Sequence, residues 1–146
     1  MPDWFQWYVR QTEKQKVWAR YRDRYVCPCC FMPTLSARAA YDACEICDWE
    51  DDGQDSDDAG MVRGGPNGDY SLSEARENFK QHLTMYRPAD THAFAYEQMD
   101  RRSKELLIRN FTIAVQSGSD ERWRMALFVE QELAAEQTQR ERMGYS

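Results

Sequence analysis

The stretch Cys27-Pro28-Cys29-Cys30, followed after thirteen residues by Cys44-Glu45-Ile46-Cys47, decides the fold of this chain. It contains all five cysteines of the protein within 21 residues. Two Cys-x2-Cys pairs at this separation are typical of a four-cysteine zinc site, because each pair lies on a tight turn that lets both sulfurs reach one ion at about 2.3 Å. The alternatives are a buried cluster of free cysteines and a disulfide pair. We predict one structural zinc ion per chain, bound by Cys27, Cys30, Cys44 and Cys47.

Cys29 is the fifth cysteine and lies inside the first pair. Since Cys27 and Cys30 already have ligand spacing, Cys29 is left as a spare sulfur, an alternative ligand or a redox-sensitive thiol. Four thiolates leave zinc no open coordination position, so the ion is expected to hold the fold rather than to activate a substrate. Clustered cysteines in a reducing compartment favour metal thiolates over disulfides.

Three further motifs follow the cysteines in a fixed order. They are Trp49-Glu50-Asp51-Asp52-Gly53-Gln54, Arg63-Gly64-Gly65-Pro66-Asn67 and Ser71-Leu72-x-Glu74-Ala75-Arg76-x-Asn78-Phe79. Together with the cysteine pairs, these motifs resemble the cysteine-rich CPCC domain over about residues 25–86. The resemblance implies a small bacterial zinc-ribbon-like domain whose members have no settled biochemical activity. Phe31 departs from the pattern, since the family usually has glycine after the first cysteine turn, where a positive φ is often needed.

The composition limits the classes of protein to consider. The chain has 146 residues, of which 42% are hydrophobic and 13% aromatic, enough for a packed core. No stretch approaches 18 uncharged apolar residues, and the N-terminus lacks a signal-peptide apolar segment, so we expect a cytoplasmic protein without membrane association. The net charge of −6 is uneven, since residues 41–60 carry nine acidic and no basic side chains.

The N-terminal residues 1–24 are predicted to form an amphipathic helix. Asp3 with Gln6 three residues later resembles a helix N-cap, so the helix can begin at Trp4. Aromatic side chains then recur at roughly helical spacing, with basic residues between them. We interpret this stripe as the face that docks on the zinc module; the alternative is an aromatic and basic surface that stacks nucleic-acid bases. The stripe consists of Trp4, Trp7, Tyr8, Val17, Trp18, Tyr21 and Tyr25.

The C-terminal half is predicted to be mostly helical. Ser71 with Glu74 indicates a capping box, and that helix should end at Pro88. His82 shares its apolar face and is expected to be packed rather than to bind metal. Further helices are expected over Ala93–Gln116, with a stop at Gly118, and from about Asp120, with fraying after Glu136. The predicted class is α+β, in which flanking helices clasp a zinc-ribbon-like module at 25–86 and residues 87–146 form a helical extension.

The acidic segment after the second cysteine pair has several possible uses. A calcium loop starting at Asp48 would need a bidentate Glu at its twelfth position, where Ala59 stands. The remaining interpretations are a solvated charged loop and an acidic patch that binds a basic partner. The partner-binding candidates are Asp51, Asp52, Asp55, Asp57 and Asp58.

Three functional hypotheses follow from these features. We find no nucleophile, positioned histidine or open metal site beside the carboxylates, so the leading hypothesis is a non-enzymatic protein-interaction module. In its specific form, an immunity protein neutralises a cognate toxin through the acidic surface. The second hypothesis is a nucleic-acid-binding zinc ribbon, against which the acidic segment would repel phosphates. The third is a thiol redox sensor that uses Cys29.

Overall fold

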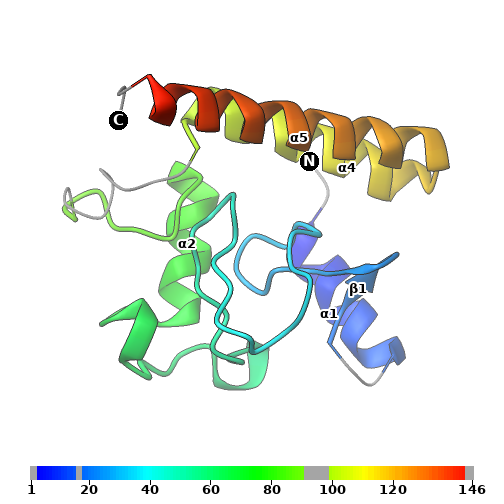
Figure 1. Ribbon diagram of the computed structural model, residues 1–146. Coiled ribbons are helices and arrows are strands. Elements are labelled where there is room, and N and C mark those ends of the chain that lie inside the picture. Colours follow the sequence, from blue (N-terminus) through cyan, green and yellow to red (C-terminus); the bar gives the residue numbers. More distant parts are fainter. Residues whose placement is uncertain (1–2, 16–17, 91–98, 144–146) are drawn as a thin grey trace. The chain divides into compact units, whose positions relative to one another are not determined.

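The computed structural model describes residues 3–15, 18–90 and 99–143 (Figure 1). The chain divides into two compact units, residues 1–97 and 98–146. The described helices, together with one two-stranded sheet, agree with the predicted α+β class. The elements are α1 (Trp4–Gln15), β1 (Arg20–Tyr21), β2 (Arg24–Tyr25), the 3-10 turns η1 (Ser56–Asp58) and η2 (Gly65–Asn67), α2 (Leu72–His82), α4 (Arg101–Ser117) and α5 (Asp120–Arg142).

Helix α1 begins where the sequence predicts and ends earlier. The Asp3 carboxylate accepts a hydrogen bond from the Gln6 backbone at 3.1 Å, which confirms the predicted cap. The helix ends at Gln15, so the prediction of one helix through residue 24 is wrong. The antiparallel strands β1 and β2 occupy residues 20–25 instead, with Arg22 in the turn at φ +56°.

The docking face of α1 is centred on Tyr8, which is fully buried. Tyr8 shares a small core with Ala19 and Val26, and Trp7, Tyr21 and Phe31 pack around it. The ring centroids of Tyr8 and Phe31 lie 5.1 Å apart. The described part of the predicted aromatic stripe therefore packs against Phe31 of the first cysteine turn from a helix and a hairpin rather than from one long helix.

Helix α2 has the predicted start and a different end. The Ser71 hydroxyl accepts from the Glu74 backbone at 3.0 Å, whereas the Glu74 carboxylate binds Arg87. The helix ends at His82, because Leu83 adopts a left-handed conformation with φ +60°, and not at Pro88. The following segment returns to the cysteines, where the Met85 amide donates to the Cys47 carbonyl at 2.9 Å. His82 is partly buried and lies outside the cysteine cluster.

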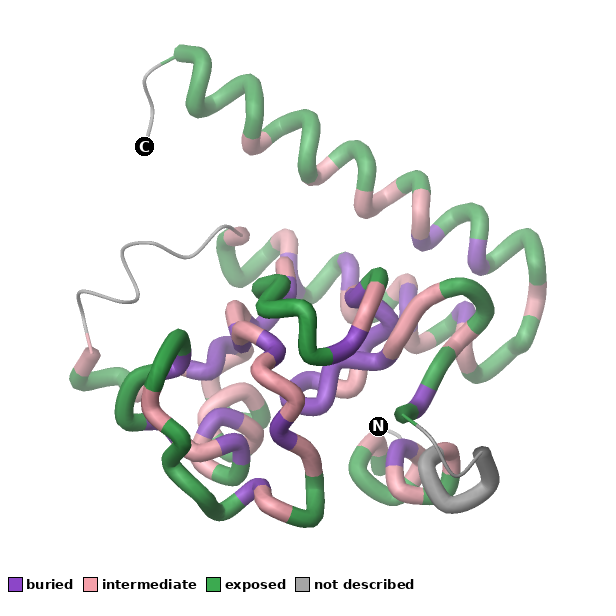
Figure 2. The backbone as a smooth tube through the Cα atoms, turned by 60° about the horizontal axis from the view of Figure 1, so that its bottom comes forward, coloured by how far each residue is buried: buried purple, intermediate pink, exposed green. Residues whose placement is uncertain are grey.

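The second unit is a helical hairpin. Asp100 caps α4 by accepting from the Ser103 amide at 2.8 Å, and Gly118 ends that helix at φ +66°, as predicted. The predicted start at Ala93 lies outside the described residues, but Asp100 is a non-helical N-cap, so the prediction of one continuous helix over Ala93–Gln116 is wrong. Helix α5 continues through the segment that was expected to fray, as far as Arg142. The hairpin core consists of Leu107, Phe111, Ala114, Trp123 and Ala126, all buried (Figure 2).

Candidate metal centre

The two cysteine pairs lie on turns of the same construction. In the first turn, the Phe31 amide donates to the Cys27 carbonyl and the Cys27 amide donates to Met32, both at 2.9 Å. The second turn repeats this pattern one for one, with Asp48, Cys44 and Trp49 in the equivalent places and the same two distances. A single β-bridge flanks each turn, Tyr25 with Leu35 and Ala43 with Glu50.

Phe31 and Asp48 occupy the corresponding position of the two turns, and both have positive φ, +64° and +71°. The positive φ at Phe31 is expected from the sequence, and there a bulky side chain enters the left-handed region at a cost in strain. The positive φ at Asp48 is not, although aspartate tolerates that conformation better than most residues. Each turn thus accepts an unfavourable backbone angle at the place where it reverses direction.

The turns bring together the sulfurs of the four cysteines predicted as ligands. All four atoms lie within 4.8 Å of one another, and the Cys27–Cys47 and Cys30–Cys44 pairs are 3.6 Å apart. A tetrahedral ion with metal–sulfur distances of about 2.3 Å requires sulfurs separated by about 3.8 Å. The cluster has nearly the size of that tetrahedron, so its residues fit one metal ion. The members are Cys27, Cys30, Cys44 and Cys47.

The environment of these thiols is dry and strongly coupled. Each of the four is at most 2% exposed. Burial raises the pKa of Cys27, Cys30 and Cys47, so these thiols hold their protons in the absence of a metal. Burial acts in the same direction on Cys44, but hydrogen bonds from the other thiols and from Thr34 lower its pKa well below the ordinary value. Burial and mutual hydrogen bonds thus couple the four thiols, and a metal ion that binds there must displace their protons.

Cys29 lies beside the cluster without belonging to it. Its side chain is 1% exposed, and burial raises the pKa of its thiol. The four clustered sulfurs already supply a complete tetrahedral set, so Cys29 is not needed as a ligand.

Much of the predicted acidic surface is folded into the protein. Asp51 is fully buried, and its carboxylate accepts from Arg38 Nε at 2.8 Å and from the Ala39 amide at 2.8 Å. The expectation that Asp51 faces a partner is therefore wrong, because Arg38 and the backbone occupy its oxygens. Asp55 accepts from the Tyr8 hydroxyl at 2.6 Å and from Arg38 Nη1 at 3.0 Å, which ties α1 to this segment.

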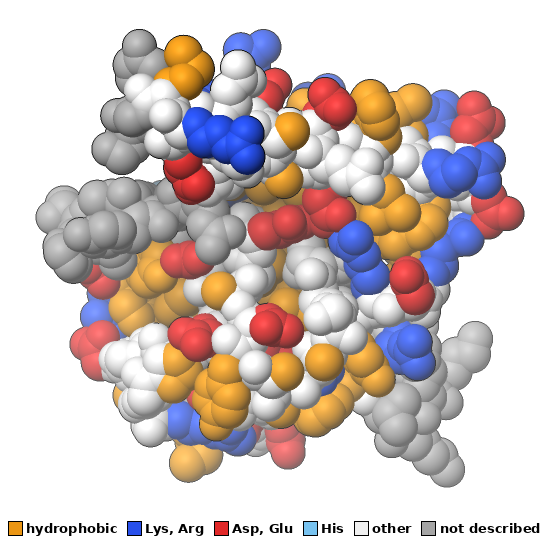
Figure 3. Space-filling model, in the orientation of Figure 1, with side chains coloured by type: hydrophobic (Ala, Val, Ile, Leu, Met, Phe, Trp, Pro, Cys, Tyr) orange, Lys and Arg blue, Asp and Glu red, His pale blue; other side chains and the backbone are white. Residues whose placement is uncertain are grey.

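The other acidic candidates differ in exposure. The side chains of Asp52 and Asp58 are 7% and 21% exposed, and both pair with Arg63. Asp57 is the exposed member of the set. Figure 3 shows both acidic and basic side chains on the visible surface. Sequence reasoning missed the arginines because they lie outside the acidic segment, at positions 38, 63 and 76.

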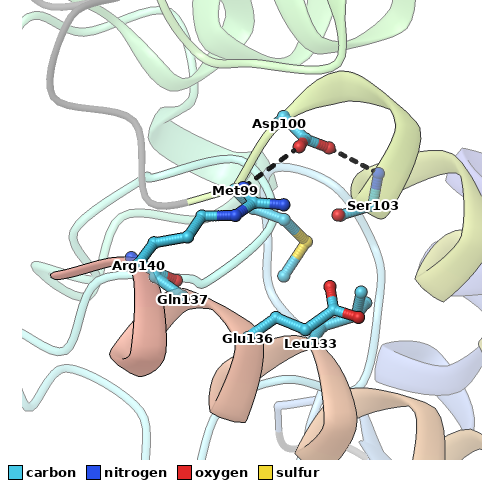
Figure 4. Close-up of a pocket in the computed structure, with 7 residues that line it drawn as sticks. All are labelled: Met99, Asp100, Ser103, Leu133, Glu136, Gln137 and Arg140. Atoms are coloured by element: carbon cyan, nitrogen blue, oxygen red, sulfur yellow. Dashed lines mark hydrogen bonds and ion pairs between the residues drawn. The ribbon is translucent and has the colours of Figure 1, made fainter. Parts of the chain in front are cut away.

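Two other features bear on function. A pocket between the start of α4 and the end of α5 has a volume of about 10 Å³, room for one water molecule, and the Asp100–Arg140 ion pair spans it (Figure 4). We therefore place no substrate there.

Among the described residues, no helix combines the length and apolar composition needed to cross a membrane.

The geometry defines the class of protein as a cysteine-rich domain whose four buried sulfurs are positioned to bind a metal ion. The family model for cysteine-rich CPCC proteins matches residues 25–98, half of the chain. The chain belongs to the cysteine-rich CPCC family, which confirms the resemblance predicted from its motifs. A search of curated proteins and a search of solved structures each found no match.

Proposed function

We propose that this protein binds one structural zinc ion and acts as a non-enzymatic protein-interaction module. The observation that carries the proposal is the closed set of four buried sulfurs. Four thiolates in a tetrahedron select zinc or an iron–sulfur centre among biological metals, and a single-ion site of this size suits zinc. Because no coordination position is left for a substrate or for water, the ion's role is to hold loops in place.

The surface that the metal would stabilise offers material for protein contact. Three large apolar side chains lie on its loops, Tyr41 at 59% exposure, Met61 at 58% and Val62 at 55%. The Tyr41 amide donates to the Asp51 carbonyl at 3.0 Å and Arg63 Nη1 donates to the adjacent Asp52 carbonyl at 2.8 Å, so the two loops lie close together. Exposed apolar and aromatic side chains that gather beside an arginine are typical of contact surfaces. The exposed apolar side chains of these loops support the proposal of an interaction module.

The immunity-protein form of the proposal needs a basic partner, such as a toxin encoded by a neighbouring gene. Its support is the net charge of −6 and the exposure of Asp57. The test is to replace Asp57 with Lys and to measure the association rate with that basic protein as ionic strength rises. Exposed charges act mainly through steering, so Asp57→Lys should slow association and flatten its salt dependence.

Glu77→Lys is the matched control, since Glu77 is exposed on α2 and the charge change is the same. An equal slowing by both variants would show that only net charge matters. An association rate unchanged by Asp57→Lys would contradict the acidic interface.

The β1–β2 hairpin favours a second candidate, nucleic-acid binding. Exposed Arg20 stacks over Tyr25, with 5.0 Å between its guanidinium carbon and the ring centroid. The guanidinium carbon of exposed Arg22 lies 5.5 Å from the ring centroid of Tyr21. Such arginine–aromatic pairs resemble those on single-strand-binding surfaces. Salt-dependent binding of single-stranded RNA or DNA, lost on Arg20→Gln, would select this candidate over the first.

The redox hypothesis has the least support. A reactive cysteine needs access to oxidant and a lowered pKa, whereas Cys29 is buried and its pKa is raised. These properties favour a packed, spare sulfur.

A further inference from the structure

Arg76 reaches the first cysteine turn from helix α2. Its Nε donates to the Pro28 carbonyl at 2.8 Å. That carbonyl belongs to the peptide that joins Pro28 to Cys29, in the middle of the turn that carries Cys27 and Cys30. The hydrogen bond therefore connects a rigid helix to the backbone that directs these two ligands.

The surroundings of Arg76 hold its side chain in one place. The guanidinium carbon lies 5.2 Å from the ring centroid of Phe31, 5.5 Å from that of Phe5 and 5.9 Å from that of Tyr8. Its Nη2 donates to the Ser56 hydroxyl at 3.1 Å. The side chain is 13% exposed, so its charge acts through a medium that screens less than water does.

The electrostatics of the cluster give this cation a role. Four thiolates and one divalent ion sum to two negative charges, which are costly to bury without a positive charge nearby. Burial lowers the pKa of Arg76, while the charge of Asp55, whose carboxylate lies 3.8 Å from Nη2 of Arg76, acts in the opposite direction. The guanidinium remains protonated at neutral pH, since arginine loses its proton only at extreme pH. A protonated guanidinium therefore donates to the backbone that lies between Cys27 and Cys30.

We propose that Arg76 is a positioning residue of the metal centre, which fixes the first cysteine turn through the Pro28 carbonyl and offsets the negative charge of the metal-bound thiolates. The inference rests on the proposed function, because it presupposes a metal-loaded protein. Hydrogen-bonding partners around metal ligands typically change metal affinity by about 10- to 100-fold when they are removed. Arg76 therefore sets how long the metal stays bound without contributing a ligand.

The test measures zinc transfer from the intact, folded protein to an excess of a chromophoric chelator. Arg76→Met keeps the length and the apolar contacts of the side chain, and it should release zinc about tenfold faster than the unmodified protein. Arg76→Lys should fall between the two, because it keeps the charge and loses the planar donor that reaches Pro28. Arg87→Met is the matched control, since Arg87 forms its ion pairs with Glu74 and Asp69 and should release zinc at the unmodified rate.

A second measurement separates positioning from ligation. The cobalt-substituted Arg76→Met protein should keep the absorption bands of a tetrahedral four-sulfur site, because its ligands are unchanged. Equal release rates for Arg76→Met and the unmodified protein would overturn the inference, as would equal acceleration by Arg87→Met. If Arg76→Met does not fold, Arg76→Lys decides, and a rate equal to that of the unmodified protein overturns the inference. Absence of metal from the unmodified protein would instead contradict the proposed function.

Discussion

The unit that contains the cysteines (residues 1–97, here the cysteine unit) and the α4–α5 hairpin hold their backbones in place by different means. Between residues 18 and 71, the first unit contains two strands of two residues and two 3-10 turns of three residues. The hairpin consists of helices of 17 and 23 residues, whose side chains meet in an apolar seam that includes Phe111 and Trp123, with ring centroids 5.8 Å apart. The loops of the first unit depend on the sulfur cluster and on arginine–carboxylate ion pairs, whereas the second unit depends on helix caps and apolar packing.

The backbone angles show what this difference costs. Six described non-glycine residues have positive φ, and all six belong to the cysteine unit. A left-handed conformation costs about 1–2 kcal/mol for a residue with a side chain, so strong interactions elsewhere must impose it. In the cysteine unit, these strong interactions are the sulfur cluster and the buried arginine–carboxylate pairs. Removing them should therefore damage the first unit more than the second. The residues are Arg22, Phe31, Ala39, Tyr41, Asp48 and Leu83.

Loss of one metal ligand should give the largest effect. Cys44→Ser removes one of the four clustered sulfurs, and structural zinc contributes on the order of 10–16 kcal/mol to small domains. We expect amide hydrogen exchange to increase strongly over residues 18–90 and much less over 101–142. Equal increases in both ranges, or no increase in either, would break the comparison between the two units.

The buried ion pair between Arg38 and Asp51 should give the next largest effect. Both side chains are fully buried, so Asp51→Ala removes one of the two carboxylates that pair with Arg38 and leaves only Asp55, at a cost of up to about 3–5 kcal/mol. Denaturant unfolding of the metal-loaded protein measures this cost. Asp57→Ala is the control, since Asp57 is exposed and should change the free energy of unfolding by less than about 0.5 kcal/mol. Similar effects of the two variants would contradict a structural role for the acidic segment.

A core truncation in the hairpin should act without touching the metal. Leu107 is fully buried in α4, and Leu107→Ala should destabilise the hairpin by about 2–5 kcal/mol through the cavity that it leaves. Hydrogen exchange should rise in α4 and α5, while metal content stays unchanged. Loss of metal from Leu107→Ala would show that the stability of the cysteine unit depends on the hairpin, contrary to the comparison.

The smallest effect concerns the surface pair of Glu74 and Arg87. The Arg87 hydrogen bond lowers the pKa of Glu74, so the pair stabilises the fold above the ordinary glutamate pKa of about 4.3. This contribution disappears as the pH falls through the lower pKa of the folded state. Water screens the partly exposed pair, which limits its worth to less than about 1 kcal/mol. Glu74→Gln should reduce stability at pH 7 by that amount, and thermal unfolding should show the difference shrinking as the pH is lowered below about 4.3. A difference that does not shrink would contradict the assignment.

The sequence predicted those parts of the structure that depend on local chemistry. Cysteine spacing identified the four clustered sulfurs, because ligand turns need fixed separations. The caps at Asp3 and Ser71 follow from side chains that act within one helical turn, and the stop at Gly118 follows from the ease with which glycine adopts positive φ. The end of α1 was missed because the aromatic spacing continues past Gln15 into strands, where the same side chains pack on a different backbone.

The acidic segment escaped prediction for a different reason. Its carboxylates pair with arginines 5 to 21 positions away, such as Arg63 with Asp58 and Arg76 with Asp55. No periodic pattern connects such residues, since their contacts depend on the tertiary fold rather than on local spacing. A run of acidic residues therefore resembled an external surface when part of it forms internal ion pairs.

The most direct test of the account is the metal stoichiometry of the folded protein. Native mass spectrometry of protein purified without added metal should show one zinc ion per chain. Cys29→Ser should keep the ion, because the four clustered sulfurs do not include Cys29, whereas Cys30→Ser should lose it. Folded protein without zinc, or loss of the ion from Cys29→Ser with retention in Cys30→Ser, would contradict the account.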